Sequence, residues 1–342
     1  MLLKKLFILF LLILLVYPTV SCSNQNQAYV FRKDNIKVAL VVSGPVNDGS
    51  WNEAAYKGLK RFQEDYKAKI SVIEKVSLVD AKEVFKELAE RHFNLIIAHG
   101  HDYGLALQKI AKMYPEVFFC VTGAQISQFP NLCSFNFKDE QYGYLLGVVA
   151  GLNTSTNKVG IVVGKKLPSV ENTIIGMRQG LKSINPKVDL VVSYINDWGD
   201  IAKGKEAGIT QINTGIDIIT HLADASGIGV IKAAEDADIL AIGAITDQHD
   251  LAPTTVITSG LQDASQLIYL ACESYKDQIL EPIIYKFGLK HQVIDLAPSY
   301  GNIDPTIETK INRIKSELTD IEVAQDEQNE NIRKKRRGSL KL

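Results

Sequence analysis

The chain has 342 residues, with 38 Lys and Arg against 39 Asp and Glu, which gives a formal net charge of −1 at pH 7. This balance provides no general attraction to polyanions, so it argues against direct nucleic-acid binding by the body of the chain. A hydrophobic content of 46% with 23% charged residues is ordinary for a folded protein, and the length predicts two domains.

The N-terminus has the pattern of an export signal. Two lysines precede an unbroken apolar run from Leu6 to Tyr17, which is too short to span a bilayer. Cys22 stands where a bacterial lipoprotein signal would be cleaved and the new terminal cysteine acylated. We therefore expect residues 1–21 to be a signal peptide, residues 22–35 a polar tether, and the mature protein to be lipid-anchored on the extracytoplasmic face of the cell membrane. A plain secreted protein or a short uncleaved anchor is the alternative.

From Lys37 onward, short apolar runs alternate with amphipathic stretches, which is typical of βα units and a parallel sheet. The first series of expected strands is Val38–Val42, Ile70–Glu74, Leu95–Ala98, Val117–Val121 and Leu132–Phe135. The second series is Val159–Val163, Val188–Ile195, Ile216–His221 and Ile239–Ala244. Helical spacing of apolar residues fills the intervals between them. The sequence predicts an α/β fold of two Rossmann-like lobes with parallel sheets and a ligand cleft between them.

The lobe boundaries follow from the order of these elements. Another strand, Val256–Thr258, and a helix from Ala264 are difficult to stack onto the second lobe alone. The N-terminal lobe is expected to comprise residues 36–153 with about 252–282, and the C-terminal lobe residues 154–251 with about 283–300. Residues 301–321 would form a closing helix. The charged tail, residues 322–342, carries a basic run. Such a run is typical of a solvated terminus, and binding to an anionic membrane surface is the alternative.

Three cysteines remain after the anchor, and they show no metal-like spacing. Cys120 and Cys133 fall inside apolar runs, where a buried cysteine behaves as a small hydrophobe. Core packing is the favoured interpretation of all three, Cys272 included, and a Cys120–Cys133 disulfide is the alternative.

Loops after the strands are the candidate site, because ligands of open α/β sheets bind outside the carboxyl ends of the strands. The loop after the first strand carries Asn47, Asp48, Ser50, Trp51 and Asn52. Its polar residues are good helix caps, which is the alternative to a ligand role. Trp51 sits at a strand's carboxyl end, where a flat aromatic ring can stack on a base.

A second tryptophan, Trp198, occupies the loop after the second strand of the second lobe. Matching places in two lobes predict an aromatic clamp in which Trp51 and Trp198 approach each other when the lobes close.

Other loops add polar groups to the predicted site. His101 and Asp102 follow the third strand; a zinc site there would need a further ligand, so hydrogen bonding to ligand or backbone is favoured. Asp224 and Gly227 start a helix whose free N–H groups and small residues allow close approach of a ligand. Asp247 can accept hydrogen bonds from the vicinal hydroxyls of a ribose, with an exposed turn as the alternative.

The chain lacks the motifs of the common enzyme classes. The glycines at 227 and 229 do not complete a dinucleotide fingerprint, and there is no P-loop lysine and no Gly-x-Ser-x-Gly elbow. We therefore expect a binding protein, without cofactor or metal, and not an enzyme such as a nucleosidase.

With these residues laid out, the chain resembles the basic membrane protein family of lipoproteins, which includes purine nucleoside receptors that serve ABC importers. The similarity covers about residues 36–315, and its marks are Asn47-Asp-Gly-Ser-Trp-Asn52, Ala202-Lys-Gly-Lys205, Gly227-Ile-Gly229 with Ala233-Ala-Glu235, and Ile242-Gly-Ala-Ile-Thr-Asp-Gln248. The resemblance implies a monomer with the type I periplasmic binding-protein fold, a nucleoside ligand and an ABC permease as partner.

The resemblance also implies roles for single residues. It places Trp51 and Trp198 against the base and Asp247 on the ribose. The nucleoside receptors carry an aspartate where this chain has Thr122 and a lysine where it has Gln262, which implies a different nucleoside or a degenerate site.

Within the family, the chain is most similar to the branch of the Bacillus lipoprotein Med, a positive regulator of competence genes. The matching stretches are Ala98-His-Gly-His-Asp-Tyr103, Asn196-Asp-Trp-Gly-Asp200 and Thr246-Asp-Gln-His-Asp-Leu251. An indirect regulatory role is therefore the alternative to transport.

Overall fold

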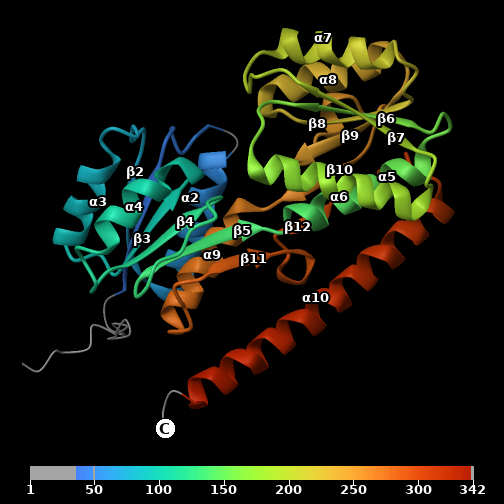
Figure 1. Ribbon diagram of the computed structural model, residues 1–342. Coiled ribbons are helices and arrows are strands. Elements are labelled where there is room, and N and C mark those ends of the chain that lie inside the picture. Colours follow the sequence, from blue (N-terminus) through green and yellow to red (C-terminus); the bar gives the residue numbers. More distant parts are fainter. Residues whose placement is uncertain (1–35, 49–50, 340–342) are drawn as a thin grey trace, which may run out of the picture.

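The computed structural model describes residues 36–48 and 51–339, with side chains through residue 328. Figure 1 shows two α/β lobes and one long C-terminal helix. The expected signal peptide, Cys22, the tether and Ser50 lie outside the described residues.

The first lobe is built on a six-stranded sheet in which every neighbouring pair is parallel. In spatial order its strands are β11 (Ile284–Phe287), β5 (Leu132–Phe137), β4 (Phe118–Thr122), β3 (Leu95–His99), β1 (Lys37–Val42) and β2 (Lys69–Ile73). Successive side chains of a strand face opposite sides of a sheet. In β1, Leu40 packs in the core beneath α2 (Trp51–Tyr66) and α9 (Ala264–Lys276), and Val41 packs in the core beneath α3 (Ala81–Glu90) and α4 (Gly104–Ala111). The sheet is therefore covered by helices on both faces.

The second lobe repeats this arrangement. Its sheet runs in the order β12 (Ile294–Leu296), β10 (Val256–Gln262), β9 (Leu240–Ile245), β8 (Ile218–Leu222), β6 (Lys158–Val163) and β7 (Asp189–Tyr194). Only the short edge strand β12 is antiparallel to its neighbour. Helices α5 (Asp139–Asn153) and α6 (Pro168–Ile184) cover one face, and α7 (Ile201–Ile212) and α8 (Asp224–Asp236) cover the other. The predicted α/β architecture with two sheets of parallel strands is confirmed.

The lobe boundaries differ from those expected from the sequence. We expected residues 252–282 in the first lobe, but β10 extends the second sheet beside β9, and only α9 returns to pack against α2. Residues 283–300 are divided as well, because β11 joins the first sheet and β12 the second. Helix α5 follows a strand of the first sheet yet packs against α6 in the second lobe. The chain therefore crosses between the lobes three times, after β5, after β10 and between β11 and β12.

Close packing of α5 against α6 depends on glycine. A Cβ atom at Gly143 would lie 1.9 Å from the carbonyl oxygen of Thr173, and one at Gly176 would lie 2.0 Å from the carbonyl oxygen of Glu140. Any side chain at either position would push the helices apart, so these glycines fix the distance between two helices that border the cleft.

The cysteines of the described chain are buried and free, as core packing predicted. Cys120 and Cys133 are paired across strands β4 and β5, and no disulfide joins them. Burial raises the pKa of the Cys120 thiol, and the neighbouring Cys133 adds to this effect.

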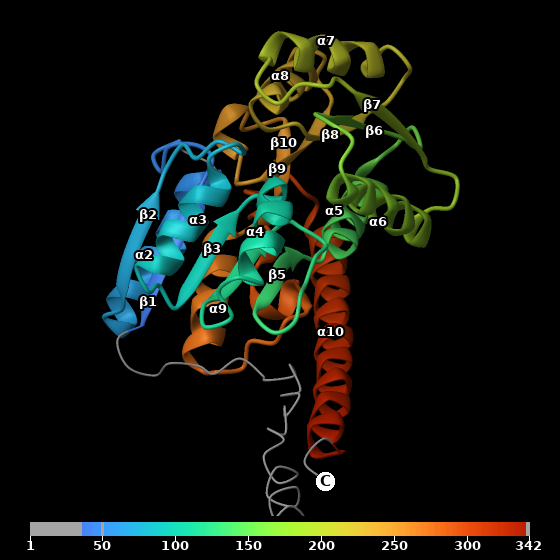
Figure 2. The same cartoon turned by 60° about the vertical axis from the view of Figure 1, so that its left-hand side comes forward.

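The C-terminal helix is longer than expected. Helix α10 spans Pro305–Ser339, so the segment from residue 322 that we expected to be a polar tail continues the helix, and Glu322 is only 1% exposed. Figure 2 shows α10 starting beside α5 and continuing past the lobes. Glu322 is buried because Lys138, Gln141 and His291 surround its carboxylate. Among the described helices, none is long and apolar enough to cross a membrane.

Candidate functional site

A cavity of about 360 Å³ lies between the lobes, at the carboxyl ends of strands from both sheets. It is lined by Trp51, Gly100, His101, Thr122, Gly123, Gln125, Asn136, Phe137, Asp139, Leu167, Ser169, Val170, Thr173, Trp198, Leu222, Ala223, Asp224, Ile245 and Gln262. The lining includes six side chains predicted from the sequence: Trp51, His101, Thr122, Trp198, Asp224 and Gln262. The strand-end loops of two separate lobes therefore meet at one cavity of a size that suits a small ligand.

Trp51 enters the cavity from the first residue of α2. Its indole ring stacks on the imidazole of His99, with 4.1 Å between ring centroids and 24° between ring planes. Asp48 in the same loop accepts hydrogen bonds from the backbone N–H groups of Asn52 and Glu53, so it caps α2. The loop thus combines the capping role and the aromatic wall that its sequence left as alternatives.

Trp198 reaches the same cavity from the loop between β7 and α7. Its ring packs against Gly164, where a Cβ atom would lie 2.2 Å from the indole Cε3. The Trp198 carbonyl also accepts a hydrogen bond from the backbone N–H of Ser226, at 3.1 Å. Backbone and packing contacts in the second lobe therefore hold this indole at the cavity, and the first lobe holds that of Trp51.

Behind Trp51, His99 and Thr122 form a hydrogen-bond chain. The Nε2 atom of His99 lies 3.2 Å from the carbonyl oxygen of Trp51, and its Nδ1 atom lies 2.9 Å from the hydroxyl of Thr122. Complete burial lowers the pKa of His99 to about 3, so its imidazole is neutral and carries one proton. A carbonyl only accepts, which puts that proton on Nε2 and makes Nδ1 the acceptor for the Thr122 hydroxyl.

One carboxyl group of the second lobe lines the cavity, and a carboxylate of the first lobe influences its pKa. Asp224 starts α8 with φ at 44°, in the left-handed region, and lines the cavity from the second lobe. Partial desolvation by the surrounding protein raises the pKa of Asp224, and the charge of Asp48 in the first lobe raises it further. A ligand that donates hydrogen bonds to Asp224 would favour its ionised form.

Other predicted site residues do not line the cavity; these are Asn47, Asp48, Asn52, Asp102, Gly227 and Asp247. The carboxylate of Asp102 pairs with His101, at 3.0 Å. Gly227 packs against His221, whose Nδ1 would lie 2.0 Å from an added Cβ atom. The ligand roles of this group stay predictions, and the contacts just described give Asp102 and Gly227 structural partners.

Asp247 is bonded within its own lobe. Its Oδ2 accepts a hydrogen bond from the hydroxyl of Tyr300 at 2.6 Å, and its Oδ1 accepts one from the backbone N–H of His249 at 3.1 Å. In this conformation both oxygens of the carboxylate have protein partners, and the residue is exposed. Each carboxylate oxygen can accept a further hydrogen bond, so the ribose role of Asp247 stays a prediction.

Sequence reasoning missed several lining residues, and Asn136 is the most informative. It is 3% exposed, its Nδ2 donates to the carbonyl of Ala124 at 2.9 Å, and its Oδ1 has no hydrogen-bond partner among the described residues. An Asn inside the apolar run of β5 was the signal available in the sequence. Asp139, at the start of α5, was hidden because the run after β5 reads only as a helix N-terminus.

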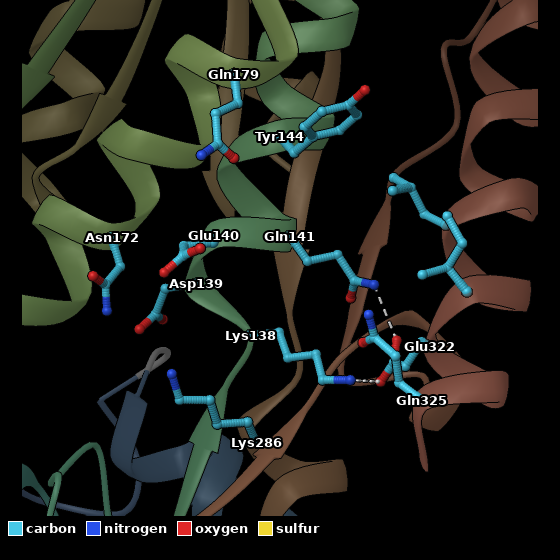
Figure 3. Close-up of a pocket in the computed structure, with 12 residues that line it drawn as sticks. Lys138, Asp139, Glu140, Gln141, Tyr144, Asn172, Gln179, Lys286, Glu322 and Gln325 are labelled. Carbon is cyan, nitrogen blue, oxygen red and sulfur yellow. Dashed lines mark hydrogen bonds and ion pairs between the residues drawn. The ribbon is translucent and has the colours of Figure 1, made fainter. Parts of the chain in front are cut away.

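A larger cavity of about 440 Å³ lies behind the cleft, between α5, α6 and α10 (Figure 3). Asp139 lines both cavities. The second cavity is lined mainly by acidic, basic and amide side chains. Lys138 and Gln141 both contact the carboxylate of Glu322.

Near this second cavity, one group of side chains has the composition of a metal site. His291, Glu322 and Asp326 each offer a ligand atom within 4.8 Å of the others. The ammonium groups of Lys138 and Lys290 already lie 3.0 Å from Glu322 and 3.3 Å from Asp326. Their positive charges take the electrostatic place of a cation, so the donor set is better explained as an ion-pair network.

Several known proteins are similar to this chain in sequence and in architecture. The Bacillus subtilis transcriptional activator protein Med is 25% identical to the chain, over 81% of the chain and 87% of Med. The crystal structure of a transcriptional activator of the comK gene from Bacillus halodurans matches with a TM-score of 0.72 and 26% identity, over 82% of this chain and 96% of that one. An ABC transporter solute-binding protein from Conexibacter woesei matches with a TM-score of 0.67 and 26% identity, over 84% and 97%. The fold is therefore the type I periplasmic binding-protein fold expected from the sequence. Residues 35–330 match the family described as ABC transporter substrate-binding protein PnrA-like, so the chain belongs to this Bmp family.

Proposed function

We propose that this protein is an exported, lipid-anchored monomer that captures a purine nucleoside and delivers it to an ABC permease. One observation carries the proposal: indole rings from opposite lobes, Trp51 and Trp198, line one cavity. Aromatic rings bind the faces of flat heterocycles, and a volume of about 360 Å³ is in the range of small-ligand sites.

We further propose that the cavity binds its ligand without chemical change. The imidazole of His99 behind Trp51 would be the natural general base, but both of its nitrogens have protein partners. Its pKa near 3 also makes it a weak base at neutral pH.

Intrinsic fluorescence offers a direct test, because the chain has only two tryptophans and both line the cavity. We expect adenosine, guanosine or inosine to quench this fluorescence saturably. Trp51→Ala should weaken binding by about tenfold to a hundredfold, since stacking on an aromatic ring contributes about 1–3 kcal/mol per base.

Phe129→Ala is the matched control, because Phe129 is an exposed aromatic residue of the first lobe that does not line the cavity. The affinity of the Phe129→Ala variant for nucleosides should equal that of the wild type. Absence of binding by every nucleoside, or equal affinity of Trp51→Ala and the wild type, would contradict the proposal.

The anchor is tested separately. Replacing the proposed acylation site, Cys22→Ala, should release the protein from the membrane fraction and abolish incorporation of labelled palmitate. A variant that stays in the membrane would point to an uncleaved N-terminal segment as the anchor.

A second candidate function is regulatory, and it is favoured by the likeness to Med and to the comK activator. In that case the cavity would sense a ligand and alter gene expression indirectly. Deleting the gene would then change transcription without lowering nucleoside uptake, whereas a transport receptor would show reduced uptake first.

A further inference from the structure

The indole of Trp51 is held by rings from distant parts of the first lobe. It stacks on the imidazole of His99, the last residue of β3, with 4.1 Å between ring centroids. It also contacts the ring of Phe137, the last residue of β5, with 6.3 Å between centroids and 52° between ring planes. His99 covers one face of the indole, so a ligand in the cavity can stack only on the other face.

His99 also holds the backbone of Trp51. Its neutral imidazole donates from Nε2 to the Trp51 carbonyl at 3.2 Å, at the first residue of α2. His99 is fully buried and does not line the cavity. It can therefore act on a ligand only through the residues that it holds.

Thr122 in turn holds the imidazole. Its hydroxyl donates to Nδ1 of His99 at 2.9 Å and accepts the backbone N–H of Gly100 at 3.2 Å. Donation to Nδ1 keeps the single ring proton on Nε2, the atom that faces the Trp51 carbonyl. Thr122 borders the cavity, but the residue is 0% exposed, so its hydroxyl acts inside the wall and not on its surface.

We infer that Thr122 and His99 are positioning residues that orient the Trp51 indole for stacking on a ligand. The inference rests on the proposed nucleoside function, and it changes the role expected of Thr122 from contact with the base to support of the ring that stacks on it. The hydrogen bonds run in order from Thr122 through His99 to Trp51. A ring that is oriented before binding loses less conformational entropy when the ligand arrives.

Substitutions at Thr122 test this chain of contacts. Thr122→Val nearly keeps the volume of the side chain and removes the hydroxyl, whereas Thr122→Ser keeps the hydroxyl. Thr220→Val is the matched control: Thr220 is a buried residue of β8 whose hydroxyl donates to the Ile242 carbonyl at 2.8 Å, and it does not line the cavity. Each valine variant removes a buried hydrogen bond, so each should lower thermal stability.

Two readouts separate positioning from this general loss of stability. The chain has two tryptophans, so in a Trp198→Phe background the fluorescence anisotropy decay reports the motion of the Trp51 ring alone. We expect larger local motion in Thr122→Val and unchanged motion in Thr122→Ser and Thr220→Val. With Trp198 in place, calorimetric titration with guanosine, inosine and adenosine should show affinity about threefold to tenfold weaker in Thr122→Val, and within about twofold of wild type in the other two variants.

Nitrogen NMR of the isotopically labelled wild-type protein tests the same chain without any substitution. The His99 ring should be neutral near pH 7 and carry its proton on Nε2. A proton on Nδ1 would show that Thr122 does not direct the imidazole toward the Trp51 carbonyl.

The outcomes separate this inference from the function on which it rests. If nucleosides bind the wild type and Thr122→Val equally, or if the Trp51 ring moves no more freely in Thr122→Val than in Thr220→Val, the positioning role is wrong while the nucleoside function stands. If the ring is loosened in Thr122→Val but no nucleoside binds the wild type, the nucleoside function is wrong while the hold of Thr122 and His99 on Trp51 stands.

Discussion

Glu322 on α10 contacts residues at two of the three crossovers between the lobes. We expect these contacts to stabilise the docking of α10, and replacing Glu322 by glutamine tests this role. Its Oε1 lies 3.0 Å from Nζ of Lys138, which precedes α5, and 3.3 Å from Nδ1 of His291, between β11 and β12. Its Oε2 accepts from Nε2 of Gln141 at 3.0 Å and from the backbone N–H of Lys290 at 3.2 Å. Glu322→Gln keeps the shape of the side chain and removes its charge.

The size of the effect can be worked out in two ways. Burial alone would raise the pKa of Glu322, but hydrogen bonds from His291, Gln141 and Lys138 outweigh it and lower the pKa from 4.5 to about 2. That difference corresponds to roughly 3 kcal/mol of stability. Removing one member of a buried ion pair costs about 3–5 kcal/mol, and Asp326, 4.0 Å from Lys138, compensates part of it. We expect Glu322→Gln to destabilise the docked helix by about 2–3 kcal/mol.

The sign of the pH dependence follows from the lowered pKa. The carboxylate form is favoured in the folded state, so its stabilisation is complete above the unfolded pKa of 4.5 and is lost as the pH falls through the folded value of about 2. Hydrogen exchange of α10 peptides measures this locally, without assuming two-state unfolding of a two-lobed chain. The difference between the wild type and Glu322→Gln should be full near neutrality and shrink below about pH 5.

Asp326→Asn is the control on the same helix. Asp326 is 29% exposed and its Oδ2 lies 3.3 Å from Lys290, so this substitution should cost less than about 1 kcal/mol. Equal acceleration of exchange in the two variants, or a difference that persists unchanged at low pH, would refute the view that one buried carboxylate carries the contact.

Two further predictions concern glycines at close contacts, one against Trp198 and one between α5 and α6. Gly164→Ala should displace the indole of Trp198, since the new Cβ would lie 2.2 Å from its ring; we expect weaker nucleoside binding and a shifted emission maximum in fluorescence titration. Gly176→Ala should separate α5 from α6 and lower stability by about 1–3 kcal/mol in denaturant titration, because its Cβ would meet the Glu140 carbonyl at 2.0 Å. Gly199→Ala, whose Cβ would come no closer than 4.0 Å to Asp197, should be nearly neutral in both assays.

Much of the architecture was predictable because buried parallel strands leave a strong pattern. Strands β1 and β3 are apolar almost throughout, and their positions were correct to within a residue. The partner of a strand is not encoded in the same way. Strand β10 has the apolar character that suits either sheet, and only the three-dimensional register places Gly260 opposite Ala244 in the second.

The site was predictable where loops follow strands. Trp51, Thr122 and Trp198 were found because a strand's carboxyl end determines where the next residues lie. The same rule did not foresee the surroundings of Asp247, which lies outside the cavity lining and accepts a hydrogen bond from Tyr300, a residue distant in sequence. Contacts between residues far apart in the chain decide such cases, and one sequence does not display them.

The crossover from β5 to α5, which would act as a hinge between the lobes, contacts both α10 and the ligand cavity. Lys138 and Asp139 are consecutive residues at the crossover from β5 to α5, yet Lys138 pairs with Glu322 on α10 and Asp139 lines the ligand cavity. Any rotation of α5 relative to β5 must move both side chains. A ligand that draws on the Asp139 carboxyl therefore acts on the crossover that α10 restrains, and weakening the restraint with Glu322→Gln should change ligand affinity as well as helix stability. If affinity stays constant while α10 loosens, the long helix supports the hinge without taking part in closure.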